Sequence, residues 1–107
     1  MDNQHKLIRG YRELSQEEID LMNRIKEAGG KLLQLQAELA MKLTKDYQAM
    51  LARADDQTLS SEEREAANFE LDRRSLAEPY RWIAIGKTDI QTGVMALVRA
   101  VAQPTDN

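Results

Sequence analysis

Apolar residues that alternate three and four positions apart constrain the fold of this chain most. One such stripe consists of Met22, Ile25, Gly29, Leu32, Leu39 and Leu43, with the polar Gln36 between Leu32 and Leu39 at the same spacing. A second consists of Ile83, Gly86, Ile90, Gly93, Val94, Leu97 and Val101. Residues at this spacing share one face of an α-helix, which then packs on a partner helix. The simplest fold is all-α, an antiparallel helical hairpin with residues 83–101 packed against 19–43.

The start of the first helix has a clear signal. Ser15 and Glu18 match a capping box, in which each side chain accepts a hydrogen bond from the other residue's backbone amide. Leu14 and Ile19 occupy the positions of the accompanying hydrophobic staple. We expect a helix from this point to about residue 53. The pair Gly29–Gly30 inside it indicates a kink or a very close helix approach, and we expect a long, kinked first helix.

The middle of the chain is predicted to turn and then re-enter a helix. Residues 55–58, with the sequence DDQT, are typical of a turn. Ser60 and Glu63 match a second capping box, which predicts a charged helix to about residue 76 with a weak apolar face that includes Phe69. Pro79 suits the first turn of a further helix, and Pro104 ends it. We expect one domain over residues 1–107, with a flexible N-terminus (1–9) and an extended hairpin region (37–78).

Composition favours self-association. The chain has 107 residues, of which 42% are hydrophobic and 5% aromatic. A domain of this size buries only a modest core, and oligomerisation covers the apolar surface that remains. The stripe Val94, Leu97, Val98 and Val101 is more apolar than one facing helix requires. We therefore expect a compact homo-oligomer.

Charge, hydropathy and cysteine content argue against several classes of protein. The net charge is −3, residues 1–31 are neutral, 32–72 are acidic and 73–107 are mildly basic. A long nucleic acid would need a continuous basic stripe, so no such partner is expected. No apolar run approaches the roughly 18 residues of a membrane span, and the N-terminal segment lacks the apolar core of a signal peptide. With no cysteine in the chain, the expected location is the cytoplasm.

Residues suited to catalysis are scarce. The only histidine is His5, near the start of the chain, which makes a histidine base or a histidine metal site improbable. The serines at 15, 60 and 61 have capping roles and no evident activating partner. We expect no enzyme activity, no metal and no cofactor.

Two clusters combine aromatic and basic residues. In the first, Tyr11 precedes a helix that carries Lys26, with further cations at Arg9, Arg12, Arg24 and Lys31. A tyrosine in such a place can stack on a nucleobase, and the cations can bond phosphate oxygens. Alternatively, Tyr11 packs on its own helix and Lys26 is a solvated surface lysine.

The second cluster follows Pro79 and contains Arg81, Trp82, Lys87, Thr88 and Arg99. Three copies of this segment around a symmetry axis would form a polar, cationic pocket. Alternatively, Trp82 belongs to the core, Lys87 lies on the surface and Arg99 is one half of an ion pair.

The segments GYRELS (10–15), NRIK (23–26) and RWIAIGKTDIQTGVMALVRAVAQP (81–104) carry a family resemblance. They are similar to the phage anti-CBASS cyclic-nucleotide sponges, whose helical hairpin also occurs in the anti-Thoeris sponges. The resemblance covers residues 9–36 and 80–104, about half of the chain. It implies an all-helical hexamer that binds cyclic dinucleotides such as 3′,3′-cGAMP between paired protomers. Some such proteins also take cyclic trinucleotides such as cA3, near three-fold axes. The messenger is sequestered uncleaved in the cytoplasm of the infected bacterium, and the CBASS effector stays inactive.

The resemblance also implies roles for individual residues. Tyr11 would stack on a base and Lys26 would contact a phosphate, each from both protomers of a pair, with Arg12 and Asn23 beside them. For a cyclic trinucleotide, the implied contacts are Arg81, Thr88, Lys87 and Arg74. The acidic residues 37–78 depart from a compact member of the family. Three other functions stay open: a phosphodiesterase, a structural or adaptor helical oligomer without a nucleotide ligand, and a helix-turn-helix DNA-binding protein.

Overall fold

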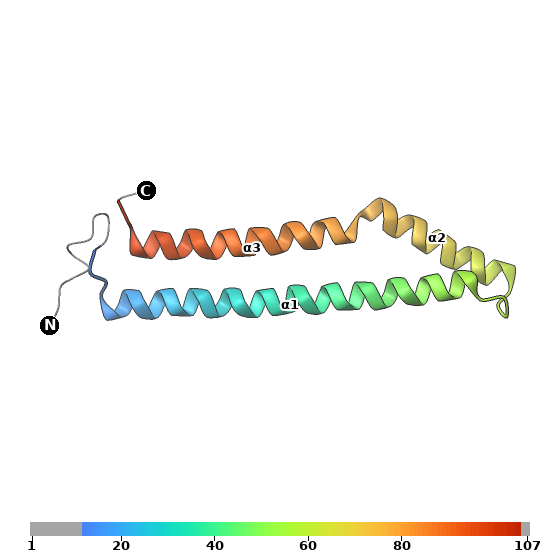
Figure 1. The fold of residues 1–107 in the computed structure, drawn as a ribbon, viewed down its shortest axis with the longest axis horizontal. Coiled ribbons are helices and arrows are strands. Elements are labelled where there is room, and N and C mark those ends of the chain that lie inside the picture. The colour runs from blue at the N-terminus through green and yellow to red at the C-terminus, as the bar shows by residue number, and fades with distance from the viewer. Residues whose placement is uncertain (1–11, 106–107) are drawn as a thin grey trace. The chain divides into compact units, whose positions relative to one another are not determined.

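The structure, a computed structural model, describes residues 12–105. This range contains three α-helices and no strand: α1 (Gln16–Asp55), α2 (Ser61–Ala77) and α3 (Pro79–Ala102) (Figure 1). The prediction of an all-α fold is confirmed. Two compact units divide the chain: a first unit of Met1–Leu33 with Thr88–Asn107, and a second unit of Gln34–Lys87. Tyr11, His5 and Arg9 lie outside the described residues.

Both predicted capping boxes are present. The Glu18 amide donates to Ser15 Oγ at 3.1 Å, and the Ser15 amide donates to Glu18 Oε1 at 2.9 Å. Ser60 and Glu63 exchange the same two hydrogen bonds, at 3.1 and 3.4 Å. These bonds satisfy amide groups that have no partner within the helix, which is why α1 and α2 begin where they do.

The ends of α2 and α3 have left-handed backbone conformations. Glu78 (φ 51°) follows α2, and its amide donates to the carbonyls of Arg74 and Ser75 at 3.1 and 3.3 Å. Pro79 then begins α3, as its fixed φ favours. Gln103 (φ 49°) follows α3 and donates to the Arg99 carbonyl at 2.7 Å. Both helices thus stop at the left-handed residue that immediately follows them.

In the first unit, α1 and α3 are antiparallel and come into close contact at Gly29. Gly29 is the one buried residue of α1. A Cβ built on it would lie under 3.0 Å from Val94 Cγ2, closer than real Cβ atoms come. The α-helix continues without a break through Gly29 and Gly30, and Gly29 permits the close approach to Val94.

The face that α1 presents to its neighbours differs from the predicted stripe at two positions. Met22, Ile25 and Leu33 are half-buried in the first unit, whereas Leu32 is 49% exposed. In the second unit, Gln36, Ala40 and Leu43 are half-buried, and Leu39 is 49% exposed. Apolar residues stand at both 32 and 33 and at both 39 and 40, so the sequence pattern fits either choice. In the structure Leu33 and Ala40 pack against the neighbouring helix, and Leu32 and Leu39 stay exposed.

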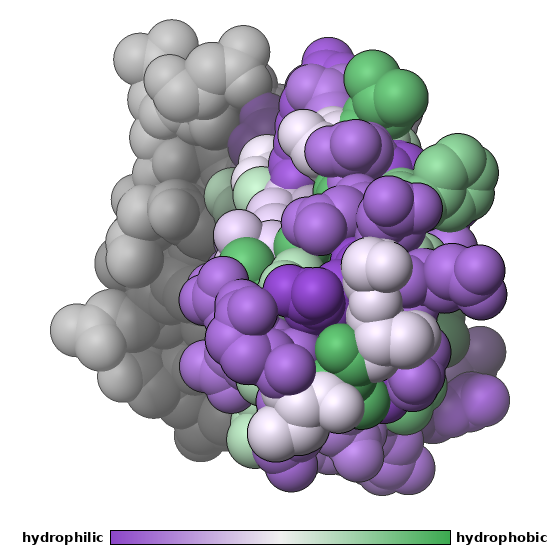
Figure 2. All heavy atoms as spheres, turned by 90° about the vertical axis from the view of Figure 1, so that its right-hand side faces the viewer, coloured by the Kyte–Doolittle hydropathy of each residue, from purple (hydrophilic) through white to green (hydrophobic). Residues whose placement is uncertain are grey.

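The second unit contains a buried arginine, Arg74. Arg74 is 6% exposed, donates from Nη2 to the Leu43 carbonyl at 2.8 Å, and lies 5.6 Å from the centroid of the Tyr47 ring. Ala67 is also buried, but Phe69, which was expected on the apolar face of α2, is 69% exposed. The apolar face of α2 is weak, and an arginine makes its contact with α1. The end of this unit where α1 gives way to α2 is mainly hydrophilic, with scattered apolar residues (Figure 2).

The apolar core is thin. None of the large side chains between residues 12 and 105 is fully buried. Many large apolar side chains are exposed. The most exposed are Leu76 (86%), Met95 (71%), Phe69 (69%), Leu35 (61%), Met41 (61%), Trp82 (57%) and Leu97 (56%). In the described range, no helix combines the length and the apolar character that crossing a membrane requires.

Candidate functional site

Two of the predicted dinucleotide contacts lie on one exposed flank of α1. Asn23 and Lys26 are three residues apart, which makes them neighbours on the helix surface. Both are exposed, and neither has a hydrogen-bond or ion-pair partner among residues 12–105. Lys26 therefore presents an ammonium group, with three donors and a full charge, that no described carboxylate neutralises.

Gly30 adds open space to this flank. It follows Lys26 by four residues, so it lies one turn further along the same face. Apart from the adjacent residues and the backbone of the helix itself, no atom lies within 4 Å of the place where its Cβ would be. Glycine without a neighbour lets a ligand come close to the helix backbone. We call the surface formed by Asn23, Lys26 and Gly30 the Lys26 flank. It offers a cation, an amide and an accessible stretch of helix backbone.

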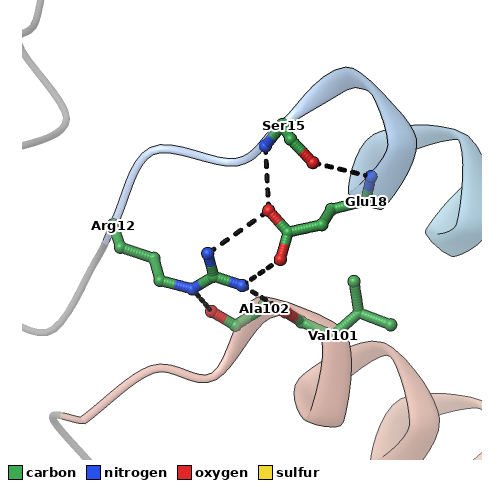
Figure 3. A network of polar contacts seen from close by, with 5 residues as sticks. All are labelled: Arg12, Ser15, Glu18, Val101 and Ala102. Atoms are coloured by element: carbon green, nitrogen blue, oxygen red, sulfur yellow. Dashed lines mark hydrogen bonds and ion pairs between the residues drawn. The ribbon is translucent and has the colours of Figure 1, made fainter.

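The third predicted contact, Arg12, is engaged within the protein. Its Nε donates to the Ala102 carbonyl at 3.1 Å, and its Nη2 donates to the Val101 carbonyl at 2.7 Å. Nη1 donates to Glu18 Oε1 at 3.3 Å, and Nη2 also pairs with Glu18 Oε2 (Figure 3). We call this set of contacts the Arg12 clamp. It joins the residue after Tyr11 to the start of α1 and to the end of α3.

The clamp perturbs the titration of its members. The pKa of Glu18 is lowered from 4.5 to about 2, first by the hydrogen bonds from Arg12 and then by the Ser15 backbone amide. The pKa of Arg12 is raised, chiefly by its hydrogen bonds to Glu18. Both shifts favour the charged forms, so the pair is ionised throughout the range in which a phosphate ligand would bind.

Two predicted trinucleotide contacts line one hollow in the second unit. Arg74 and Arg81 face a cavity of about 400 Å³. The other residues that line it are Tyr47, Leu51, Leu71, Asp72, Ser75, Glu78, Pro79 and Tyr80. The hollow thus combines two cations, two phenol rings and two carboxylates. Arg81 also pairs with Glu78 at 3.4 Å and lies 5.2 Å from the centroid of the Trp82 ring.

The other two trinucleotide candidates do not line this hollow. Lys87 is exposed on α3 in the second unit, and Thr88 is exposed on α3 in the first unit. Trp82, for which a core position was the alternative, is 57% exposed and stacks with Arg81. Residues 12–105 contain no group of three or more histidine, cysteine, aspartate or glutamate side chains placed to hold a metal ion.

Comparison with known proteins identifies the family. The family model described as "Acb2/Tad1, hairpin domain" matches residues 3–102. The chain belongs to this family. Among the relatives in the Acb2/Tad1 hairpin family is Anti-CBASS protein 2 from Pseudomonas phage JBD67, which is 57% identical over 105 residues, covering 97% of each chain. The anti-CBASS sponge resemblance seen in residues 9–36 and 80–104 therefore extends along almost the whole chain.

The roles of several residues in both sites were not predicted from the sequence. Ser15 and Glu18 were recognised as caps, but their link to Arg12 was not. An arginine three residues before a capping serine is the signal that could have suggested it. Tyr47 and Tyr80 carried no signal, because they reach the hollow through contacts between residues far apart in the sequence.

Proposed function

We propose that this protein binds cyclic dinucleotide second messengers and sequesters them without cleavage, which blocks activation of CBASS effectors in the cytoplasm of an infected bacterium. The proposal rests on a relative with 57% identity that is named Anti-CBASS protein 2. The structural observation that carries it is the Lys26 flank, whose cation has no described partner. A cyclic dinucleotide has two phosphates and two bases, and this flank offers donors for the phosphates.

Tyr11 supplies the base contact in this proposal. It directly precedes Arg12 in the chain, and Arg12 is held at the start of α1. A phenol ring stacks on a base without regard to its identity, and such stacking is worth about 1–3 kcal/mol per base. Two protomers that each contribute Tyr11 and Lys26 would enclose both bases and both phosphates. A ligand enclosed in this way can reach nanomolar affinity, which corresponds to about −12 kcal/mol.

Self-association is part of the proposal, and a hexamer is the state we expect. The large apolar side chains that one protomer leaves exposed, such as Leu97 and Met95, provide the surface for it. Burying apolar area contributes about 25 cal/mol per Å², so a second copy covering these side chains stabilises both. Pockets that are assembled before the ligand arrives need little further ordering, which favours tight binding.

We also propose a second ligand class, cyclic trinucleotides, which would contact Arg81, Thr88, Lys87 and Arg74. The observation that favours it is the hollow of about 400 Å³ beside Arg74 and Arg81, and it supports only these two contacts, because Lys87 and Thr88 do not line it. Its two phenol rings could stack on bases, and Arg81 is exposed at its edge. Arg74 already donates to a backbone carbonyl, so its part in such a site would be limited to its remaining donors.

Isothermal titration calorimetry with 3′,3′-cGAMP tests the main proposal. After saturation, the complex is denatured and the released ligand is separated by chromatography. Tight binding with intact ligand supports sequestration, whereas recovery of a linear product would identify a phosphodiesterase. Absence of heat with cyclic dinucleotides and trinucleotides alike would leave a structural or adaptor oligomer as the function.

A further inference from the structure

The hollow in the second unit is lined mainly by aromatic and apolar side chains. Tyr47 of α1 and Tyr80 of α3 contribute phenol rings, and Leu51, Leu71 and Pro79 add apolar surface. All of its lining residues belong to the second unit. Its volume of about 400 Å³ falls in the usual range for ligand pockets, about 300–1,000 Å³, which are also mainly apolar. The hollow can therefore hold a flat ring system between side chains suited to stacking.

Both cations of the hollow are already engaged within the protein. Arg74 is 6% exposed and donates to a backbone carbonyl of α1 at 2.8 Å. Arg81 pairs with Glu78 at 3.4 Å and lies 5.2 Å from the centroid of the Trp82 ring. The carboxylates of Asp72 and Glu78 balance the two cations, so the lining residues carry no net charge. This balance favours an uncharged ligand over a phosphate group, which is an anion.

Asp72 is a polar group of the hollow that a ligand can still use. Its side chain is exposed and has no hydrogen-bond or ion-pair partner among residues 12–105. An ionised carboxylate has two acceptor oxygens and no donor, so a ligand must donate to it. Guanine presents two adjacent donors, N1–H and N2–H, which match both oxygens. Adenine presents the N6 donor beside the N1 acceptor, whose lone pair would face the second oxygen.

From these observations we propose that the hollow binds an uncharged purine base, with guanine preferred over adenine, and that Asp72 sets this preference. The rings of Tyr47 and Tyr80 stack on the base, because every base presents a π face. The proposal goes beyond the sequestration of cyclic nucleotides, since it requires neither a phosphate nor a second protomer. A cyclic trinucleotide that bound here would place one base in the hollow and leave its phosphates outside, near the exposed Arg81.

Saturation-transfer difference NMR, which detects weak ligands of large proteins, tests the proposal with guanosine, GMP and adenosine. We expect guanosine and GMP to bind equally well, because the phosphate of GMP makes no contact in the hollow. Guanosine should bind about tenfold more tightly than adenosine, as one bidentate pair provides. If GMP bound more tightly than guanosine and Arg81→Ala abolished the difference, the hollow would be a phosphate site and the proposal would be overturned. A protein that binds no guanosine, or binds adenosine equally well, would also overturn it.

Asp72→Asn and Glu65→Gln form a matched pair of variants. Each neutralises an exposed carboxylate of α2, but Glu65 does not line the hollow. Asp72→Asn should weaken guanosine binding by about tenfold without weakening adenosine binding, and Glu65→Gln should change neither. Tyr80→Ala should weaken the binding of both nucleosides, because stacking does not depend on the identity of the base. Equal guanosine affinities for Asp72→Asn and Glu65→Gln would remove Asp72 from the site.

The results also separate this proposal from the dinucleotide site. Lys26 belongs to the first unit, so Lys26→Ala should leave guanosine binding unchanged. Guanosine binding that disappears with Lys26→Ala would place the nucleoside at the Lys26 flank and overturn the proposal. A wild type that binds guanosine through Asp72 but does not bind 3′,3′-cGAMP would overturn the proposed function alone, and the reverse result would overturn only the base site. Circular dichroism of every variant verifies that the helices are intact.

Discussion

Gly29 of α1 lies directly beneath the side chain of Val94 of α3, and no residue larger than glycine fits there. A Cβ at position 29 would lie under 3.0 Å from Val94 Cγ2. Valine is branched at Cβ and holds one preferred rotamer in a helix, so its methyl group cannot swing away. We expect Gly29→Ala to destabilise the protein by up to about 2 kcal/mol. This is the cost of overpacking, about 1–3 kcal/mol, less the roughly 1 kcal/mol that alanine gains in helix propensity.

Gly30→Ala is the matched control. It makes the same chemical change one residue further on, where nothing apart from the adjacent residues and the backbone of the helix itself lies within 4 Å of the new Cβ. We expect it to stabilise the protein by about 0.5–1 kcal/mol through helix propensity alone. Urea unfolding followed by circular dichroism measures both variants. If Gly29→Ala also stabilised the protein, the close approach of the two helices would be refuted.

Much of the fold could be predicted because its signals are local. A capping box needs only four consecutive residues, and both were found at Ser15 and Ser60. The choice between Leu32 and Leu33 for the buried face could not be made, since both are leucine and only the partner helix decides. The burial of Arg74 was also unforeseeable, because its partners Leu43 and Tyr47 are about 30 residues away in the sequence.

Lys26→Ala should weaken binding of 3′,3′-cGAMP by more than about tenfold, equivalent to roughly 1.4 kcal/mol. The physical reason is the loss of a charged donor that no described residue neutralises. Since Lys26 is exposed, the helical circular dichroism and the oligomer mass should stay unchanged. Lys42→Ala is the control, because Lys42 is another exposed lysine of α1, paired with Asp46 at 2.6 Å. Equal affinities for the two variants would remove Lys26 from the site.

Stability should fall in acid as Glu18 is protonated. Its pKa is about 2 in the folded protein against an ordinary value of 4.5. A carboxyl group with a lowered pKa stabilises the fold above its ordinary pKa, and this contribution is lost as the pH falls through the folded value. We therefore expect wild type and Glu18→Gln to differ most above pH 4.5 and to converge toward pH 2. Thermal midpoints measured at matched protein concentration test this; a constant difference across the range would exclude the clamp as the cause.

Arg74→Ala should destabilise the protein by about 2–4 kcal/mol, through loss of a charged hydrogen bond and creation of a cavity. Arg74 is 6% exposed and donates to the Leu43 carbonyl. Arg73→Ala removes the neighbouring arginine, which is solvent-exposed and paired with Glu70, and should cost less than about 0.5 kcal/mol. Urea unfolding distinguishes the two. Similar small losses for both would mean that Arg74 does not hold α2 in the second unit.

The candidate site was less predictable from sequence than the fold. Lys26 was nominated because the resemblance to the sponge family implies a phosphate contact at this position. Arg12 was nominated as a ligand neighbour from the same resemblance, as a cation next to Tyr11. Its contacts with Val101 and Ala102 span about 90 positions of sequence, and no local pattern reveals them. Charge alone therefore cannot separate a ligand contact from an arginine that holds two chain ends together.

Leu97→Asp should break the self-association that we propose. Leu97 is 56% exposed on α3 and was expected on its apolar stripe, so a charge there would be buried without a partner once a second copy packs against it. Within one protomer the aspartate stays in solvent, and the helices should remain folded. Analytical ultracentrifugation should therefore show a smaller species, and the circular dichroism spectrum should be unchanged.

Since the proposed dinucleotide pocket takes Tyr11 and Lys26 from two protomers, binding of 3′,3′-cGAMP should be lost together with the assembly. Glu70→Gln, which removes the carboxylate that pairs with Arg73 on α2, serves as the control for handling and concentration. A Leu97→Asp protein that keeps the wild-type mass would place the interface on another face of the chain, whereas a dissociated protein that still binds would confine the pocket to one protomer.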